Sequence, residues 1–308
     1  MTRVSTADGW NSALLDLMRA QTRQMDAQHQ VSTQKKAVDL KGFGRESETL
    51  AAFRSAQLRL NGFLDVSKAV ASRLTTQDVA LNQIADAAQS ARDTIADALA
   101  AGRGDGLMLA LQQRFQSAVD GLNAKHQGRY LFGGARADQP PVTADTLTDL
   151  TAGPPVSTFF QNDQLKTVSR IDEASTIQTG FLANELGEDL FTVFQAIQAF
   201  AAGPSGPFSG NLTQTQKDFL ATQLTALDAA HDALVDQAAQ NGAMQTRVES
   251  HITAQEAQGD ALEGLIGDRT DVDMAEAISK LQQSQLAVQA SAQVLASLKD
   301  MSLLDLLR

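Results

Sequence analysis

The sequence predicts a mainly α-helical protein. We expect a long antiparallel helical bundle or coiled coil, built from the N- and C-terminal flanks, and a small β-containing central region. Three observations predict this class. Apolar residues recur at alternating spacings of four and three along both flanks. All six prolines lie between Pro140 and Pro207, so long helices can form on either side of them. Aromatic residues make up only 5% of the chain, which suits narrow helical seams.

The longest apolar seam runs from Leu50 to Leu99. Eleven of its fifteen seam positions are apolar. A helix of about fifty residues spans about 75 Å, so it needs a partner of similar length. The polar seam residues Asp78 and Arg92 are predicted to fix the register of that pairing at some cost in stability.

The predicted partner helix lies between Leu220 and Ile266, where nine of fourteen seam positions are apolar. The intervening chain returns, so the two long helices are expected to be antiparallel. The seam residue Asn241 is polar and is expected to contribute to the register.

Two shorter helices are predicted between these long ones. The first covers residues 107–125, with Asp105 as its N-cap. The second covers residues 187–201 and ends before the Gly203-Pro204 pair, because the residue before a proline disfavours the helical conformation.

The central region has the composition of short strands and turns. Residues 129–134 are predicted to form a strand that enters a turn. Residues 156–161 and 165–171 flank Asn162-Asp163, a turn signal, so they are predicted to pair as a β-hairpin.

The two ends of the chain carry apolar stripes of their own. From Met274 onward six of seven seam positions are apolar, and four leucines fall within the final six residues. Chain ends usually fray and are usually polar. We therefore favour packing against other chains over an intrachain core, with the termini ordering on docking. The residues expected at this interface are Val4, Trp10, Leu14, Met18, Met25, Ile278, Leu281, Val288, Leu295, Leu303, Leu304, Leu306 and Leu307.

These elements predict three parts. Terminal assembly helices cover residues 1–40 and 270–308. A helical rod domain covers residues 41–134 and 181–269. A small β-rich insert covers residues 135–180.

Composition narrows the classes of partner. The net charge is −11 and the pI is about 4.8, so binding to nucleic acid is disfavoured, as is insertion into an anionic membrane. The longest apolar run, residues 107–111, is far shorter than the roughly 20 residues of a membrane span. No secretory signal is expected at the N-terminus, so the protein is either cytoplasmic or exported without a cleavable peptide.

No catalytic, cofactor-binding or metal-binding residue is predicted, and we do not expect an enzyme. The chain has no cysteine, and its four histidines are scattered without metal-ligand spacing. Asp268, Asp271 and Asp273 form a cluster that lacks the glycine and glutamate of a calcium loop. Helix capping by Thr270 or Asp271 explains this cluster better.

Four local motifs resemble the bacterial flagellin family. They are the opening Arg3-Val4-Ser5-Thr6, the segment Val31-Ser32-Thr33, the motif that contains Tyr130, Leu131, Phe132, Gly133 and Gly134, and the C-terminal stretch 289–308. The resemblance covers residues 1–135 and 180–308 and is greater to the hook-associated members than to filament flagellins. Residues 34–46 depart from the family's pattern.

This resemblance implies a structural subunit of the bacterial flagellum that joins hook to filament. It also implies other copies, a neighbouring hook-associated protein, flagellin and an export chaperone as partners, and an extracellular location reached by type III export. Two alternatives remain open. A filament flagellin would polymerise alone into long fibres. A cytoplasmic coiled-coil scaffold or signalling protein would form a stable dimer through residues 50–99.

Overall fold

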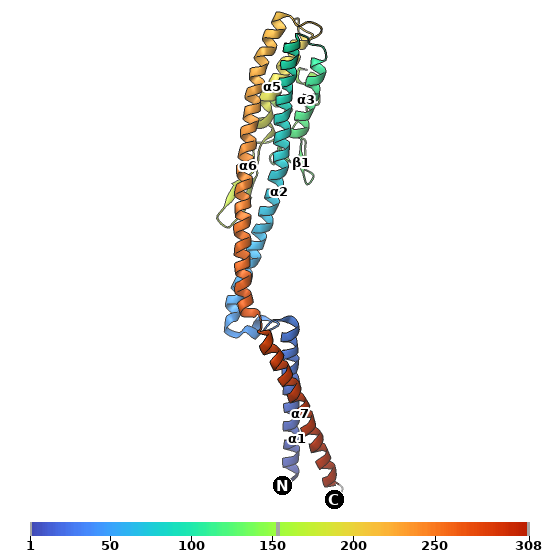
Figure 1. The fold of residues 1–308 in the computed structure, drawn as a ribbon, viewed down its shortest axis with the longest axis vertical. Helices are drawn as coiled ribbons and strands as arrows, with labels where there is room; N and C mark the ends of the chain where they lie inside the picture. Colours follow the sequence, from blue (N-terminus) through green and yellow to red (C-terminus); the bar gives the residue numbers. More distant parts are fainter. Residues whose placement is uncertain (1, 152–154, 307–308) are drawn as a thin grey trace. The chain divides into compact units, whose positions relative to one another are not determined.

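The structure is a computed structural model that describes residues 2–151 and 155–306; the side chains of residues 2–8 and 299–306 lie outside the described part. The described ranges contain long helices and two small antiparallel sheets, so the predicted mainly α class is confirmed (Figure 1). The α-helices are α1 (Thr2–Thr33), α2 (Ser47–Ala101), α3 (Leu107–Leu122), α4 (Leu147–Thr151), α5 (Ala183–Ala202), α6 (Gln214–Thr270) and α7 (Met274–Leu306).

Two 3₁₀ helices and four short strands complete the described elements. The 3₁₀ helices are η1 (Leu40–Glu46) and η2 (Val156–Phe159). The strands form two separate hairpins, in which β1 (Lys125–His126) pairs with β2 (Arg129–Tyr130) and β3 (Val168–Arg170) pairs with β4 (Thr176–Gln178).

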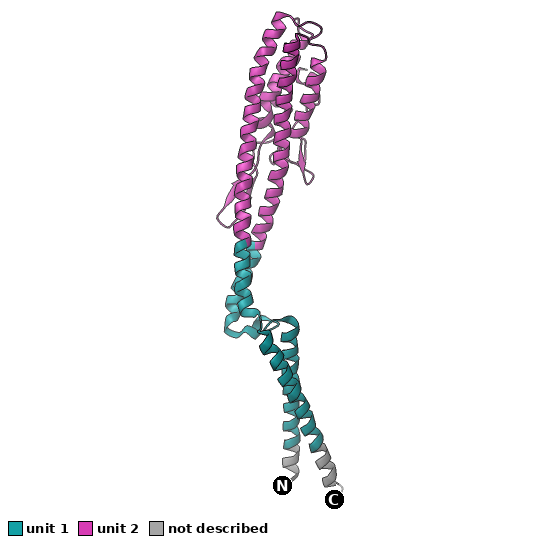
Figure 2. Cartoon of the chain, viewed as in Figure 1, with its two compact units in different colours: residues 1–60, 257–308 teal, residues 61–256 magenta. Residues whose placement is uncertain are grey.

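The chain divides into two compact units (Figure 2). Unit 1 contains residues 1–60 and 257–308, and unit 2 contains residues 61–256. Helices α2 and α6 contribute residues to both units. The three-part division predicted from the sequence was drawn on different features and stays a prediction.

In unit 2, α2 and α6 run antiparallel and are joined by the polar seam residues. Arg92 Nε donates a hydrogen bond to Asp228 Oδ1 at 2.8 Å. The buried Asn241 donates from Nδ2 to the carbonyl of Leu74 at 3.0 Å and approaches Asp78 Oδ1 at 3.5 Å. Rising residue numbers on α2 therefore meet falling numbers on α6. The expected contact of Asp78, Arg92 and Asn241 with the opposite helix is confirmed.

The core of unit 2 is formed by α3 and α5 as well as by the two long helices α2 and α6. Phe115 of α3 is fully buried, and its ring centroid lies 4.9 Å from that of Phe191 and 5.4 Å from that of Phe194, both on α5. Leu81 of α2 and Leu227 of α6 belong to the same buried cluster. Helices α3 and α5 thus thicken this part of the protein into a helical bundle.

Both predicted short helices are present; the first starts at the predicted residue with a different cap, and the second starts earlier than predicted. Helix α3 begins at Leu107 after Gly106, whose φ is +77°, so the predicted N-cap Asp105 is wrong. Asp105 instead accepts a hydrogen bond from the backbone N–H of Gly210 at 2.8 Å, which lowers the pKa of its carboxyl together with the nearby Arg103. Helix α5 begins at Ala183, four residues before the predicted start.

The predicted hairpin across Asn162-Asp163 is wrong. Residues 156–159 form η2, and β3 pairs with β4 further along the chain. Asp163 Oδ1 accepts hydrogen bonds from the backbone N–H groups of Leu165 and Ala135, and Asn162 Nδ2 donates to Asn184 Oδ1 at 2.6 Å. These side chains hold together segments that are distant in sequence instead of turning a hairpin.

Candidate assembly surface

In unit 1, α1 packs along α7 through small residues. The described side chains buried on these two helices are Ala20, Ala27, Ala277 and Ser284. Small side chains let two helices approach closely while burying little apolar area. This contact pairs the two helices but uses only part of the apolar stripe on each helix.

Large apolar side chains remain exposed on both helices. On α1, Met18 is 57% exposed and Met25 62% exposed; on α7, Leu286 is 71% exposed. An exposed row of this kind marks an interaction surface more often than an inert one. The complete set of exposed large apolar residues described on α1 and α7 is Trp10, Leu14, Leu15, Met18, Met25, Ile278, Leu286 and Val294.

The predicted interface residues divide into three groups. Trp10, Leu14, Met18, Met25 and Ile278 are exposed in the structure. The partly buried predicted residues are Leu281, Val288 and Leu295. Sequence reasoning missed Leu15, Leu286 and Val294, which lie beside the heptad seam instead of on it. The predicted residues whose side chains lie outside the described part are Val4, Leu303, Leu304, Leu306 and Leu307.

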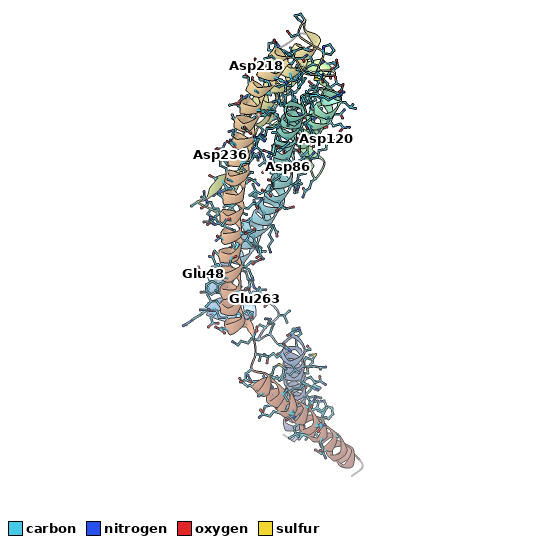
Figure 3. The ribbon with its side chains drawn as sticks, turned by 45° about the horizontal axis from the view of Figure 1, so that its top comes forward. Glu48, Asp86, Asp120, Asp218, Asp236 and Glu263 are labelled. Carbon is cyan, nitrogen blue, oxygen red and sulfur yellow. The ribbon has the colours of Figure 1, made fainter. Side chains whose placement is uncertain are left out.

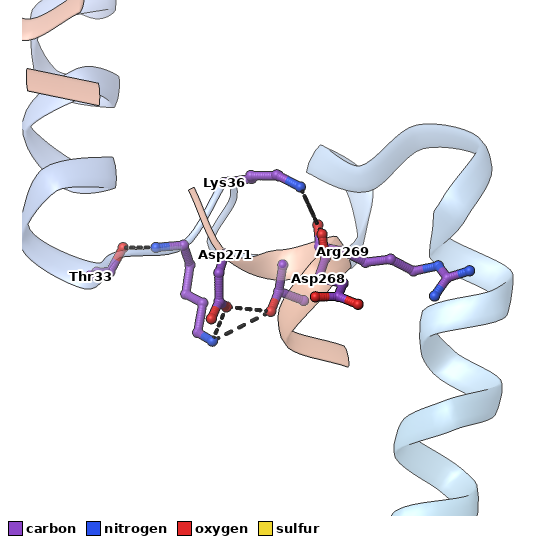
Figure 4. A network of polar contacts seen from close by, with 7 residues as sticks. Thr33, Lys36, Asp268, Arg269 and Asp271 are labelled. Atoms are coloured by element: carbon purple, nitrogen blue, oxygen red, sulfur yellow. Dashed lines mark hydrogen bonds and ion pairs between the residues drawn. The ribbon is translucent and has the colours of Figure 1, made fainter. Parts of the chain in front are cut away.

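The segment that follows α1 and the segment that precedes α7 pair with each other as a short two-stranded clamp (Figure 4). We define this clamp as residues 34–36 with residues 268–272. The backbone N–H of Lys36 donates to the carbonyl of Thr270 at 2.7 Å, and that of Val272 donates to Gln34 at 3.0 Å. Lys35 and Asp271 form an isolated antiparallel bridge between these hydrogen bonds.

Side chains reinforce the clamp. The Lys35 ammonium pairs with the Asp271 carboxylate, and Lys36 Nζ donates to the carbonyls of Asp268 and Arg269, the latter at 3.0 Å. The hydrogen bond from Lys35 is the largest cause that holds the pKa of Asp271 below its ordinary value, followed by the Thr270 hydroxyl. Lysines at a helix C-terminus also complement its exposed carbonyl groups.

The prediction that Thr270 or Asp271 caps the last helix is wrong. Asp273 Oδ1 accepts hydrogen bonds from the backbone N–H groups of Ala275 and Glu276, the first at 2.8 Å, so Asp273 is the N-cap of α7. Asp271 instead belongs to the clamp. The signal that could have found it was charge complementarity, because Lys35-Lys36 follows the first helix and the three aspartates precede the last.

The sequence motif Tyr130–Gly134 lies in unit 2, where it contributes to packing. Leu131 and Phe132 are buried in the core, and the carbonyl of Phe132 accepts the backbone N–H of Ala183 at 3.0 Å. Gly134 has φ of +66°, and a Cβ there would collide with the Asp163 carboxylate. The motif therefore anchors the start of α5 to the core of unit 2.

The described residues contain no group of three or more His, Asp or Glu side chains placed to hold a metal ion. His231 on α6 is partly exposed, and its Nδ1 lies 3.6 Å from Asp232 Oδ1. None of the helices in the described ranges has an apolar stretch long enough to span a lipid bilayer.

These features define a class of protein: a helical chain in which α1 and α7 pair and leave large apolar side chains exposed. Residues 224–307 match the family model of the bacterial flagellin C-terminal helical region. This match confirms the resemblance to the bacterial flagellin family over the C-terminal part of the chain. A search of curated proteins found no significant match.

Three solved structures have a similar fold. One is a protein of Vibrio parahaemolyticus described as a flagellar hook-associated protein, with 15% identity, a TM-score of 0.59 and coverage of 73% of this chain and 97% of that one. FlgL of Bacillus cereus has 17% identity, a TM-score of 0.54 and coverage of 71% and 98%. FlgL of Xanthomonas campestris has 12% identity, a TM-score of 0.55 and coverage of 70% and 99%. At these identities the likeness is one of fold.

Proposed function

We propose that this chain is a structural subunit of the bacterial flagellum that joins the hook to the filament. Two comparisons support the proposal: the flagellin C-terminal family model matches residues 224–307, and the fold resembles that of two FlgL proteins and one hook-associated protein. The observation that carries it is the α1–α7 pair, whose exposed Met18, Met25 and Leu286 offer apolar surface to a neighbour.

The proposed mechanism is association through the terminal helices. Full burial of one Leu or Met side chain contributes about 1.5–3 kcal/mol, so several such residues on each subunit can offset the entropy lost when the helices are ordered by docking. The partners in this proposal are other copies of the chain, a neighbouring hook-associated protein and flagellin. An export chaperone would hold the exposed C-terminal helix before assembly, and the assembled protein would lie outside the cell after export without a cleavable signal peptide.

The decisive experiment is deletion of the gene followed by electron microscopy of the cells. We expect hooks that carry no filaments, and restoration of filaments by the wild-type gene. Full-length filaments on the deletion strain would contradict the proposal, because a junction subunit is required before any filament can be added.

Behaviour in solution separates the proposal from its two rivals. A junction subunit should stay monomeric until it is offered a hook or filament end, whereas a filament flagellin should polymerise alone into long fibres. A scaffold protein should form a stable dimer through residues 50–99. One structural observation disfavours the scaffold: the seam residues Leu74, Leu81 and Ile95 of α2 are already buried within the chain.

A further inference from the structure

A basic groove lies in unit 2 beside α2 and the β1–β2 hairpin. Its volume is about 610 Å³. Arg73 from α2 and His126 and Arg129 from the hairpin line it, and none of its lining residues is acidic. The chain has 36 acidic and 25 basic residues, so most Lys and Arg side chains are expected to lie near a carboxylate. A groove lined by arginines without an acidic residue is therefore unusual in this chain.

Arg73 is held in place while part of its guanidinium is left without an acceptor. Its Nη2 donates to the carbonyl of Leu131 at 3.3 Å and to Thr167 Oγ1 at 3.2 Å. Its Nε is buried and has no acceptor among the described residues. A buried donor without a partner is costly and calls for an explanation.

Arg129 adds a second cation to the same groove. Partial burial, together with the charge of Arg129, lowers the pKa of Arg73, so the two guanidinium groups repel each other. The hairpin that carries Arg129 turns tightly through Gln127 and Gly128, both at positive φ, and Lys125 lies over the Tyr130 ring at 4.4 Å. An anion bound in the groove beside Arg73 and Arg129 would relieve the repulsion between their guanidinium groups.

The acidic surface of the same unit suggests the anion. Asp86, Asp120 and Asp236 are exposed carboxylates of unit 2 (Figure 3). The planar guanidinium fork matches a carboxylate in charge and geometry, and such pairs are among the stronger hydrogen-bonded contacts. In an assembly of identical acidic chains, a basic groove on one copy complements the carboxylates of the next.

We propose that this groove binds the carboxylate of an acidic side chain from a second copy of the chain. The proposal rests on the proposed function, because that function supplies the neighbouring copy. The groove lies in unit 2, so the contact would be separate from the apolar surface of α1 and α7.

The groove itself is tested by nuclear magnetic resonance of the full chain, with the Arg73 Nε–H signal as the readout and glutarate as the probe. We expect a saturable shift of that signal. Arg129→Gln should weaken glutarate binding about fivefold, the size expected for loss of one partly exposed ionic contact. Arg129 is exposed, so its replacement should leave the fold intact, and Arg247→Gln on the exposed face of α6 is the matched control.

Three results would overturn the carboxylate site. They are an Arg73 signal that does not move, equal affinity in wild type and Arg129→Gln, or tighter binding of inorganic phosphate than of glutarate.

The second copy is tested by sedimentation of the chain with isolated hook ends. We expect wild type and Arg247→Gln to be recruited, and Arg129→Gln to be recruited about fivefold more weakly. Equal recruitment of Arg129→Gln would overturn the neighbouring copy as the source of the carboxylate. If wild type were not recruited at all, both the proposed function and the neighbouring copy as the source of the carboxylate would be overturned. The glutarate titration would still test independently whether the groove binds a carboxylate.

Discussion

Units 1 and 2 use the same kind of residue in opposite ways. In unit 2 many large apolar side chains are buried, and Phe115, Phe191 and Phe194 pack together in the core of a bundle. In unit 1 the buried apolar residues described are three alanines and Leu50, while Trp10 and several leucines and methionines are exposed. One part of the chain therefore buries its apolar core within itself, and the other leaves large apolar side chains exposed.

The largest expected effect of this difference is on amide hydrogen exchange in the free subunit. Opening free energies range from near zero in weakly packed segments to the global value of about 5–15 kcal/mol in a core. We expect amides of α3 and α5 to exchange several orders of magnitude more slowly than those of residues 280–306. Strong protection of residues 280–306 in a monomer would contradict the comparison.

A core substitution should show that stability resides in unit 2. Phe115→Ala removes a fully buried ring that contacts two others, and we expect a loss of about 3–5 kcal/mol of unfolding free energy. The matched control is Leu109→Ala on the same helix, where the side chain is 68% exposed and the change should stay within about 0.5 kcal/mol. Denaturant unfolding followed by circular dichroism measures both variants, and equal losses would argue against a closed core.

A surface substitution in unit 1 should separate assembly from folding. Met18→Asp is expected to change stability by no more than about 0.5 kcal/mol, because the side chain is exposed in the free chain. It should nevertheless abolish recruitment to hook ends, since a carboxylate would be buried without a partner. Val79→Asp on the exposed surface of α2 is the control and should be recruited normally. Normal recruitment of Met18→Asp would remove α1 from the proposed interface.

The smallest effect concerns the charge of the clamp in unit 1. The pKa of Asp271 is lowered in the folded chain, chiefly by its hydrogen bond from Lys35. The stabilisation that ionised Asp271 gives to the clamp is therefore fully present at pH values above the ordinary aspartate pKa of about 3.9. It is lost as the pH falls through the lower pKa that Asp271 has in the folded chain. The protection of the Val272 amide, measured relative to its intrinsic exchange rate at each pH, should fall over that range. Asp271→Asn should remove the pH dependence, and Asp260→Asn on α6 should not.

The long helices could be predicted because their information is local and repeated. Most turns of α2 and α6 carry an apolar seam residue, so a polar residue at a single position does not change the prediction. The polar exceptions Asp78, Arg92 and Asn241 were also informative, because a polar residue in a seam needs a partner on the facing helix.

The turns, caps and parts of the surface could not be predicted because their side chains act over long sequence separations. Asp105 and Asp163 have the residue type of a cap and a turn, yet each accepts hydrogen bonds from backbone distant in sequence. Asp271 likewise binds Lys35 across most of the chain length. Periodicity also missed Leu286, since the close approach of α1 and α7 through alanines decides which neighbouring side chains remain outside.

The paired connections of the clamp also have a mechanical consequence. The hydrogen bonds from Lys36 to Thr270 and from Val272 to Gln34 join the chain just after α1 to the chain just before α7. Tension applied to either terminal helix is thus shared by both crossing segments at this point. After a protease cut within residues 34–36, the severed first helix would still be held by its packing along α7 and by the remaining hydrogen bonds of the clamp.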